Sequence, residues 1–198
     1  MVKSVLANRM NFHEKQKLLS DLEQGRKGLL DALTDVSEDL AARAPAPGRW
    51  SVLECVEHLA VSADYLFAQV MASHLSETPM VNQKREAMIL TVGLDRDRKV
   101  QSPDVGKPSG RFSTLAAALN HFQTTHERTI KFVEACHEDL RCKITSHPII
   151  GTVNCYEMLL MIAVHPFRHA KQIEEIKAAF ADKNGTAGAA PPCKRSRQ

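Results

Sequence analysis

Hydrophobic residues recur every three or four positions in four long stretches of the sequence, which is the spacing of one face of an α-helix. The first stretch runs from Phe12 to Ala42 and ends before the linker APAPGRW, which proline and glycine mark. Its apolar stripe consists of Leu18, Leu19, Leu22, Leu29, Leu30, Leu33, Val36 and Leu40. We therefore expect one continuous helix over residues 12–42.

The second stretch opens with WSVLE, where Ser51 is a good helix N-cap and Glu54 follows three residues later. This pair forms the capping box that marks the start of many helices, and Trp50 before it can pack on Cys55 as a hydrophobic staple. The apolar stripe then continues to about His74. We expect a helix that begins after Ser51 and ends near residue 74.

The third and fourth stretches cover about residues 113–136 and 154–181, and Asn154 with Glu157 in the N3 position predicts the start of the last helix. The connection over residues 77–110 is irregular, with a short helix expected in NQKREAMIL and a long charged loop after it. No internal repeat and no strand pattern longer than a few residues is visible. Four amphipathic helices predict an all-α four-helix bundle, and the long connection between helices 2 and 3 indicates a topology other than a plain up-and-down array.

Length and composition fit this picture. The chain has 198 residues, of which 43% are hydrophobic and 25% charged, as in a globular protein with one core. We expect a single domain over residues 1–181 and a disordered tail over residues 182–198, which are small, polar and rich in proline and glycine.

Charge, cysteine content and hydropathy limit the function classes. A net charge of +3 with few aromatic residues does not favour nucleic-acid binding. Five cysteines without a CxxC pair are typical of a reduced, cytoplasmic protein. No signal peptide and no apolar run of membrane-spanning length is visible. We therefore expect a cytoplasmic protein that binds neither nucleic acid nor membrane.

The sequence HPFRH in the last stretch places two histidines, His165 and His169, four residues apart on one helix face. Both lie in line with the apolar residues of that helix, so we expect them to face the bundle interior. Buried imidazole nitrogens need partners, and a divalent metal would satisfy both rings at once. The pair is not HExxH, because Pro166 and Phe167 occupy the second and third positions, so the zincin glutamate base is missing.

A third ligand has to come from another helix. His58 is the leading candidate, because the residues on its line of the helix are small or polar, as in the wall of a cleft. His126 is the alternative third or a fourth ligand, since it projects with the apolar residues of the third helix. His147 lies near a loop and carries little signal.

Two segments of the chain resemble the DinB/YfiT-like superfamily. RWSVLECVEHLA resembles its W-S-x-x-E-x-x-x-H-L signature on helix 2, and HPFRHAKQIEEIK resembles its H-x-x-x-H-x-x-Q-I signature on helix 4. Members of this superfamily are four-helix bundles that hold nickel, zinc or a similar divalent ion with three histidines. The resemblance, over about residues 11–181, implies His58, His165 and His169 as ligands of one metal ion.

The resemblance also sets expectations for function. It implies a metal-dependent transferase or hydrolase that acts on a small molecule, with a low-molecular-weight thiol as a candidate second substrate, and a homodimer. Three neutral ligands leave positions open for water or substrate, as in a catalytic site. The alternatives are a non-catalytic protein that holds metal in a closed site, with His126 as fourth ligand, and a metal-free interaction module. Three imidazoles alone do not select among zinc, nickel, copper and iron.

Further residues are candidates for the surroundings of the metal. Gln172 lies one turn beyond His169 and could bond a ligand imidazole or a water, while Tyr65 and Cys55 could line the cleft. Arg168 could meet an anionic substrate or a partner subunit, or form a surface salt bridge. Glu57 is expected to face solvent.

Pro166 either kinks the last helix and re-aims His165, or splits it into two helices with Pro166 at the N1 position of the second.

Overall fold

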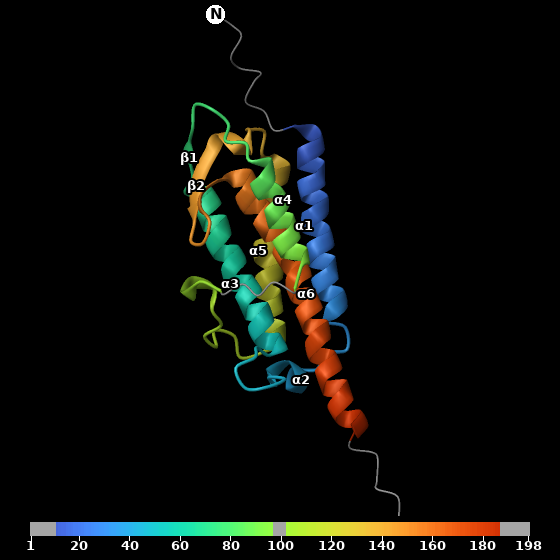
Figure 1. The fold of residues 1–198 in the computed structure, drawn as a ribbon. Coiled ribbons are helices and arrows are strands. Elements are labelled where there is room, and N and C mark those ends of the chain that lie inside the picture. The colour runs from blue at the N-terminus through green and yellow to red at the C-terminus, as the bar shows by residue number, and fades with distance from the viewer. Residues whose placement is uncertain (1–10, 97–101, 187–198) are drawn as a thin grey trace, which may run out of the picture.

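The computed structural model describes residues 11–96 and 102–186, and its main body is a bundle of four long helices (Figure 1). These are α1 (Phe12–Ala32), α3 (Val52–Met71), α5 (Leu115–Ala135) and α6 (Cys155–Thr186). In Figure 1, α1 and α6 run side by side in one direction, and α3 and α5 run in the other. The expected four-helix bundle with a topology other than up-and-down is therefore confirmed.

The prediction of one continuous helix over residues 12–42 is wrong, because this segment forms two helices. α1 ends at Ala32 and a short helix, α2 (Glu38–Ala42), follows after a turn. Asp35 adopts a left-handed backbone with φ of 64°, which a helix interior does not accept, and the Ser37 side chain caps α2 by accepting from the Leu40 amide. Leu33 and Val36 continue the apolar spacing across the turn because they pack in the same core cluster as α2.

The connection between α3 and α5 contains a two-residue strand β1 (His74–Leu75), helix α4 (Gln83–Leu94) and a single 3-10 turn η1 (Asp104–Gly106). α4 confirms the short helix expected in NQKREAMIL, and it packs against α6 on the outside of the bundle (Figure 1). The turn η1 packs against α3. Residues 97–101 of the predicted charged loop lie outside the described part of the chain.

A small antiparallel sheet at one end of the bundle was not expected. After the 3-10 turn η2 (Leu140–Cys142), strand β2 (Lys143–His147) pairs with β3 (Gly151–Asn154) as a hairpin, and β1 pairs with β2 on its other side. The hairpin closes with His147 opposite Gly151, so its turn carries Pro148, Ile149 and Ile150. This turn matters for the site, because it forms one end of the pocket described below.

Helix α6 begins as predicted, and it carries the two histidines of HPFRH. The Asn154 side chain accepts from the Glu157 amide at 2.8 Å, and the Glu157 carboxylate accepts from the Asn154 amide at 3.0 Å. Pro166 lies inside a helix that continues unbroken to Thr186, so the interpretation of two separate helices is wrong. Residues 187–198 of the predicted tail lie outside the described residues.

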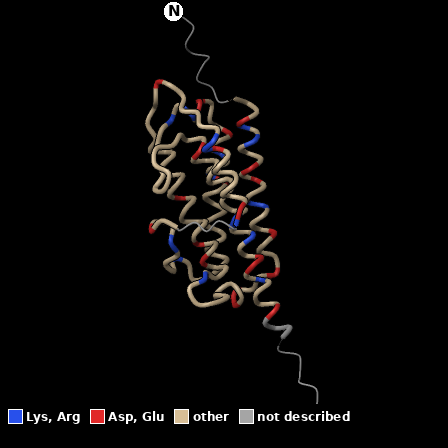
Figure 2. The backbone as a smooth tube through the Cα atoms, viewed as in Figure 1, with Lys and Arg blue, Asp and Glu red and all other residues tan. Residues whose placement is uncertain are grey.

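The long helices pack closely enough that α1 needs a glycine. A Cβ at Gly25 would lie 2.3 Å from the Ala163 carbonyl oxygen of α6, so no other residue fits there without moving a helix. Lys and Arg positions alternate with Asp and Glu positions along the backbone of the bundle (Figure 2). Among the described residues, none of the helices has the length and hydropathy that crossing a membrane requires.

Candidate metal centre

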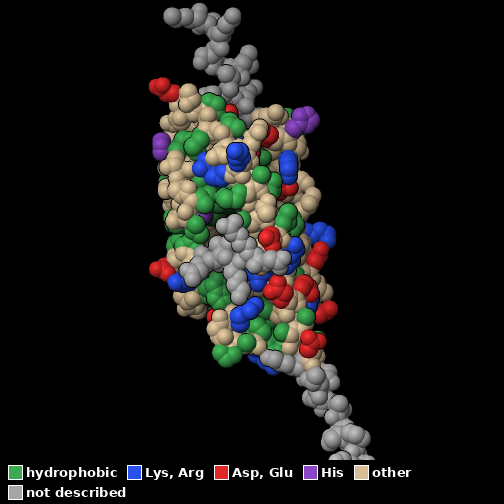
Figure 3. Space-filling view, in the orientation of Figure 1, with side chains coloured by type: hydrophobic (Ala, Val, Ile, Leu, Met, Phe, Trp, Pro, Cys, Tyr) green, Lys and Arg blue, Asp and Glu red, His purple; other side chains and the backbone are tan. Residues whose placement is uncertain are grey.

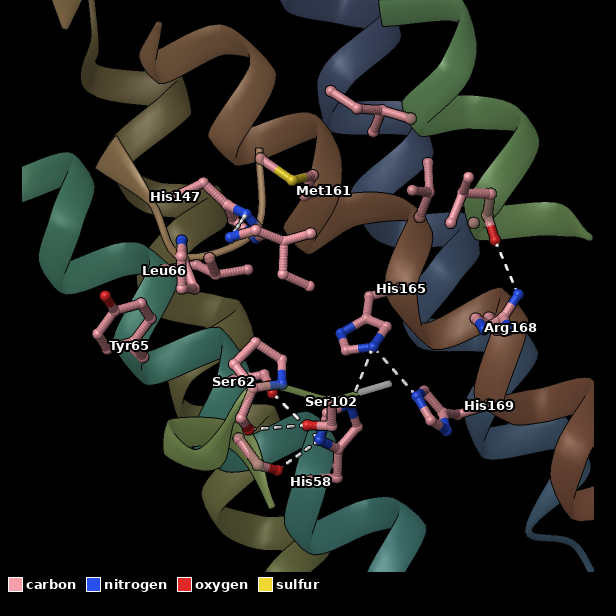
Figure 4. Close-up of a pocket in the computed structure, with 18 of the residues that line it drawn as sticks. His58, Ser62, Tyr65, Leu66, Ser102, His147, Met161, His165, Arg168 and His169 are labelled. Carbon is pink, nitrogen blue, oxygen red and sulfur yellow. Dashed lines mark hydrogen bonds between the residues drawn. The ribbon is translucent and has the colours of Figure 1, made fainter. Parts of the chain in front are cut away.

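His58 of α3 and His165 and His169 of α6 point toward one another between the two helices (Figure 4). One ring nitrogen of each lies within 4.8 Å of the other two. Nε2 of His165 is 3.1 Å from Nε2 of His58 and 3.0 Å from Nε2 of His169. We call these three residues the histidine triad.

The triad spacing suits a common metal ion. With metal–nitrogen bonds of about 2.1 Å, two imidazole ligands at angles of roughly 90–110° have nitrogens about 3.0–3.4 Å apart. The two nitrogen–nitrogen distances to His165 fall in or close to this range. The donor set, three imidazole nitrogens, suits zinc, nickel, copper or iron.

His58 is held in the tautomer that a metal ligand needs. Its Nδ1–H donates to the carbonyl oxygen of Gly106 in η1, at 2.5 Å, so Nε2 carries the lone pair. The Ser62 hydroxyl lies 3.3 Å from the same Nδ1. The Gly106 carbonyl thus fixes both the ring orientation and its protonation.

Hydrogen bonding alone does not satisfy the triad. With Nε2 of His58 unprotonated, a hydrogen on Nε2 of His165 can be directed at only one of its two neighbours, and the other contact is left without a hydrogen bond. If Nε2 of His165 is unprotonated instead, its lone pair faces the lone pair of His58. Nδ1 of His169 is buried and has no hydrogen-bond partner among the described residues. A cation at the point where the lone pairs meet would remove this conflict, so the residues present fit a metal ion.

The surroundings keep the triad neutral. Burial lowers the pKa of His58. Burial, together with the other triad imidazoles, holds the pKa of both His165 and His169 well below the usual value. Neutral imidazoles with free lone pairs are the form that binds metal.

Trp50 and Glu57 shape the triad from outside. The Trp50 indole packs over His58, with ring centroids 4.9 Å apart, and stacks near His169 at 6.3 Å. Glu57 is 1% exposed, so the expectation that it faces solvent is wrong. Its Oε1 accepts from the amides of Ser109 at 2.7 Å and Arg111 at 3.1 Å, which anchors the loop that follows Gly106.

The triad opens into a pocket of about 690 Å³, a volume typical of small-molecule sites. α3, α4, α6, η1 and the β2–β3 turn contribute its walls, as Figure 4 shows in part. The predicted cleft residue Tyr65 lines this pocket.

Two sequence-predicted residues lie elsewhere. His126 is fully buried, and its Nε2–H donates to the Leu22 carbonyl at 2.8 Å; the described ligand group does not include it. Cys55 does not line the pocket but is fully buried in the core cluster around α2 and α3, where burial raises its thiol pKa to about 12. Of the small and polar residues on the same line of α3 as His58, Ser62 and Tyr65 line the pocket.

Gln172 and Arg168 line the pocket but have different partners from those expected. Oε1 of Gln172 accepts from the Arg96 guanidinium at 3.1 Å. Arg168 is 7% exposed and donates to the carbonyl oxygens of Val92, at 3.1 Å, and Asp95 at the C-terminus of α4. Arg168 therefore lies inside the protein and not on its surface, and its side chain fastens α4 to α6.

Sequence analysis missed His147, a fourth histidine at the pocket. Its Nδ1 accepts from the amides of Ile149 at 3.1 Å and Ile150 at 3.4 Å, so the proton of the neutral ring is on Nε2. The sequence offered one hint of its position: His147 precedes Pro148 within the β-branched segment ITSHPII, and such a segment with a proline is typical of a hairpin turn. Gly106 was missed too, because its contribution is a backbone carbonyl.

Comparison with solved structures gives two similar proteins, of which the first supports the fold. YfiT from Bacillus subtilis, described as a probable metal-dependent hydrolase with an unusual four-helix bundle topology, aligns with a TM-score of 0.57 and 16% identity over 87% of this chain and 90% of that chain. TT2238, described as a four-helix bundle protein, aligns with a TM-score of 0.49 and 17% identity over 81% of this chain and 98% of that chain. No curated protein matches the sequence significantly.

Comparison with family models gives a match to the DinB superfamily over residues 21–173. This range spans most of the bundle and includes all three histidines of the triad. The chain therefore belongs to the DinB superfamily.

Proposed function

We propose that the protein is a divalent-metal-dependent enzyme that acts on a small molecule, with His58, His165 and His169 as the metal ligands. The observation that carries this proposal is the convergence of three Nε2 atoms, from two buried histidines and the half-buried His165, on the lining of a pocket of about 690 Å³. The resemblance of the fold to YfiT, described as a probable metal-dependent hydrolase, supports it.

An open site favours catalysis over a structural role. Structural zinc sites usually have four protein ligands, whereas catalytic sites keep one position for water or substrate. In the part of the chain that the structure describes, the ligand group holds three residues. His126, the candidate fourth ligand of a closed site, donates instead to the Leu22 carbonyl.

We propose hydrolysis or thiol transfer as the reaction. A divalent ion bound here would lower the pKa of a bound water or thiol and polarise a carbonyl group. The Gly106 carbonyl keeps Nε2 of His58 available, and the Trp50 indole packs against the His58 ring. Nε2–H of His147 would donate to an acceptor atom of the substrate. No Asp or Glu is among the described lining residues, so we assign no carboxylate general base.

The first test is the metal content of protein purified without a histidine tag, measured by elemental mass spectrometry. We expect about one equivalent of zinc or nickel in the wild type and almost none in His58→Ala, His165→Ala or His169→Ala. His74→Ala is the matched control, because His74 is exposed in β1 and should leave metal content unchanged. A wild type that takes up neither ion after incubation would overturn the proposal.

The second test separates the two reactions. The metal-loaded protein is assayed with p-nitrophenyl esters for hydrolysis, and with a panel of low-molecular-weight thiols and the electrophile monobromobimane for thiol transfer. Turnover that is lost in His165→Ala and retained in His74→Ala assigns the reaction to the triad. Full metal occupancy without turnover in either assay would favour the non-catalytic alternative.

A further inference from the structure

Exposed apolar side chains surround the mouth of the triad pocket. Of eight large hydrophobic residues that are exposed in the described part of the chain, three line this pocket: Met88, Val105 and Ile149. They come from three separate elements, α4, η1 and the β2–β3 turn. In Figure 3, hydrophobic side chains are visible on the face that α4 and the hairpin share.

An apolar wall connects this rim to the triad. Ile89 and Val92 of α4 and Met161 and Val164 of α6, two helices that pack on each other, line the same pocket, and Val164 directly precedes His165. No Asp or Glu is among the lining residues that the structure describes. The lining also includes Arg49, Arg96 and Arg168, of which Arg96 and Arg168 bond oxygen atoms of the protein. A molecule that reaches the triad therefore meets mainly apolar side chains.

We propose that the substrate of this site is a small molecule with an extended apolar body and one polar reacting group. The polar group lies at the triad, and the apolar body extends along α4 toward Ile149 in the hairpin turn. This inference rests on the proposed function, because the triad is taken as the reacting end. Exposing these side chains to water has a cost, which an apolar substrate would offset on binding.

The shape of the site favours a small molecule over a protein partner. The three exposed side chains surround a hollow of about 690 Å³, within the range of about 300–1,000 Å³ that holds drug-sized ligands. Five other exposed hydrophobic residues lie outside the pocket: Phe12, Met71, Leu75, Val81 and Leu94. These five provide matched controls.

The first experiment tests the apolar wall without metal. Binding of the neutral fluorescent probe N-phenyl-1-naphthylamine to chelator-treated protein is measured for wild type, Ile149→Asp and Val81→Asp. Ile149 is 53% exposed and Val81 57% exposed, so neither substitution should disturb the core. We expect binding at least tenfold weaker in Ile149→Asp and within twofold of wild type in Val81→Asp. Equal affinities in the two variants would overturn the proposal.

The second experiment tests whether one molecule can contact the apolar wall and the triad at the same time. Acetohydroxamate, hexanohydroxamate and octanohydroxamate, which share a metal-binding head group, are titrated into the metal-loaded protein. Full burial of one methylene corresponds to a gain of up to about fourfold in affinity. We expect the affinity to rise along the series by at least twofold per methylene in wild type and Val81→Asp, and the slope to fall in Ile149→Asp.

The two experiments separate the possible failures. A flat hydroxamate series on fully metal-loaded protein would overturn the apolar substrate class and leave a metal-dependent function standing. Absence of metal binding, with the probe still displaced from wild type by octanohydroxamate and not by acetohydroxamate, would support the apolar wall and overturn the proposed function.

Discussion

Glu57 and His58 are consecutive residues of α3 that hold the same loop at two points. Nδ1–H of His58 donates to the Gly106 carbonyl at 2.5 Å, and Oε1 of Glu57 accepts from the Ser109 amide at 2.7 Å. The carboxylate therefore anchors the segment whose carbonyl sets the tautomer of the triad histidine. Glu57 acts through this loop and does not itself belong to the triad.

Glu57→Ala should weaken metal binding by about tenfold to a hundredfold, the usual effect of losing support around a metal ligand. Glu57→Gln should retain most of the affinity, because both amides donate to one oxygen, which a glutamine carbonyl oxygen can replace. Competition of each variant with a zinc chelator measures the affinity, and thermal unfolding of the metal-free proteins serves as control. If Gln and Ala weaken binding equally, the negative charge and not the loop anchor is what matters.

Gly106→Ala should also lower the metal affinity, because the added Cβ would lie 2.8 Å from the Ser62 hydroxyl and 3.3 Å from Cε1 of His58. The methyl group would push the carbonyl away from Nδ1 of His58. Adding Ser62→Ala removes the shortest clash and should restore part of the affinity. If the double variant binds metal no more tightly than Gly106→Ala, the loss of affinity comes from the loop backbone and not from the contact with Ser62.

The helical spacing of apolar residues predicted the bundle because four amphipathic helices can bury their stripes in few other ways. It failed at Asp35, where the helix ends, although Leu33 is buried in the core cluster that includes Ala41 of α2, and Val36 and Leu40 pack against that cluster. The helical spacing of apolar residues therefore continues past the end of α1. The strands of the sheet have two to five residues each, too short for a reliable alternation pattern.

The triad was predictable because its side chains carry the chemistry and two of them share one helix face. The parts that were missed depend on backbone groups. A carbonyl is present at every residue, so nothing in the sequence distinguishes the one at Gly106. Glu57 was assigned to solvent from its position on α3, but its partners are amides of a loop more than fifty residues away.

His126 should make the free energy of unfolding depend on pH. Burial lowers its pKa from the usual 6.5, and its Nδ1 is buried and has no partner in the described residues, so the folded protein resists protonation. The unfolded chain therefore binds the proton first, and stability falls as pH drops below about 6.5. The slope is at most about 1.4 kcal/mol per pH unit.

The measurement is urea unfolding of metal-free protein between pH 7.5 and 5, for wild type and His126→Gln. Glutamine can still donate to the Leu22 carbonyl but does not titrate, so the variant should lose less stability over this range. The triad histidines titrate in both proteins and cancel in the comparison. If the free energy of unfolding changes with pH equally in wild type and His126→Gln, then His126 has the same pKa in the folded and unfolded protein.

Arg168→Met should loosen α4 and with it one wall of the pocket. The guanidinium donates to carbonyl oxygens of Val92 and Asp95, and hydrogen bonds to charged groups contribute about 1.5–3 kcal/mol. Lys171→Met is the control, because the exposed Lys171 ammonium also reaches the end of α4, at the Leu94 carbonyl. Hydrogen exchange of residues 83–94 should accelerate more in Arg168→Met than in Lys171→Met. If hydrogen exchange accelerates equally in the two variants, α4 is held to α6 by apolar packing and not by the Arg168 hydrogen bonds.

Pro166→Ala should raise stability and lower metal affinity. Pro166 lacks the amide that would bond the Ile162 carbonyl, one turn earlier, and an interior proline costs a helix about 3 kcal/mol. Alanine restores that bond, but it also removes ring atoms from a buried position, so we expect a net gain of only about 1 kcal/mol. Nε2 of His165 contacts both other rings of the triad, and a more regular helix would point it in a different direction. Competition with a zinc chelator should therefore show several-fold weaker metal binding. Stability and metal affinity that rise together would mean that the proline does not aim His165.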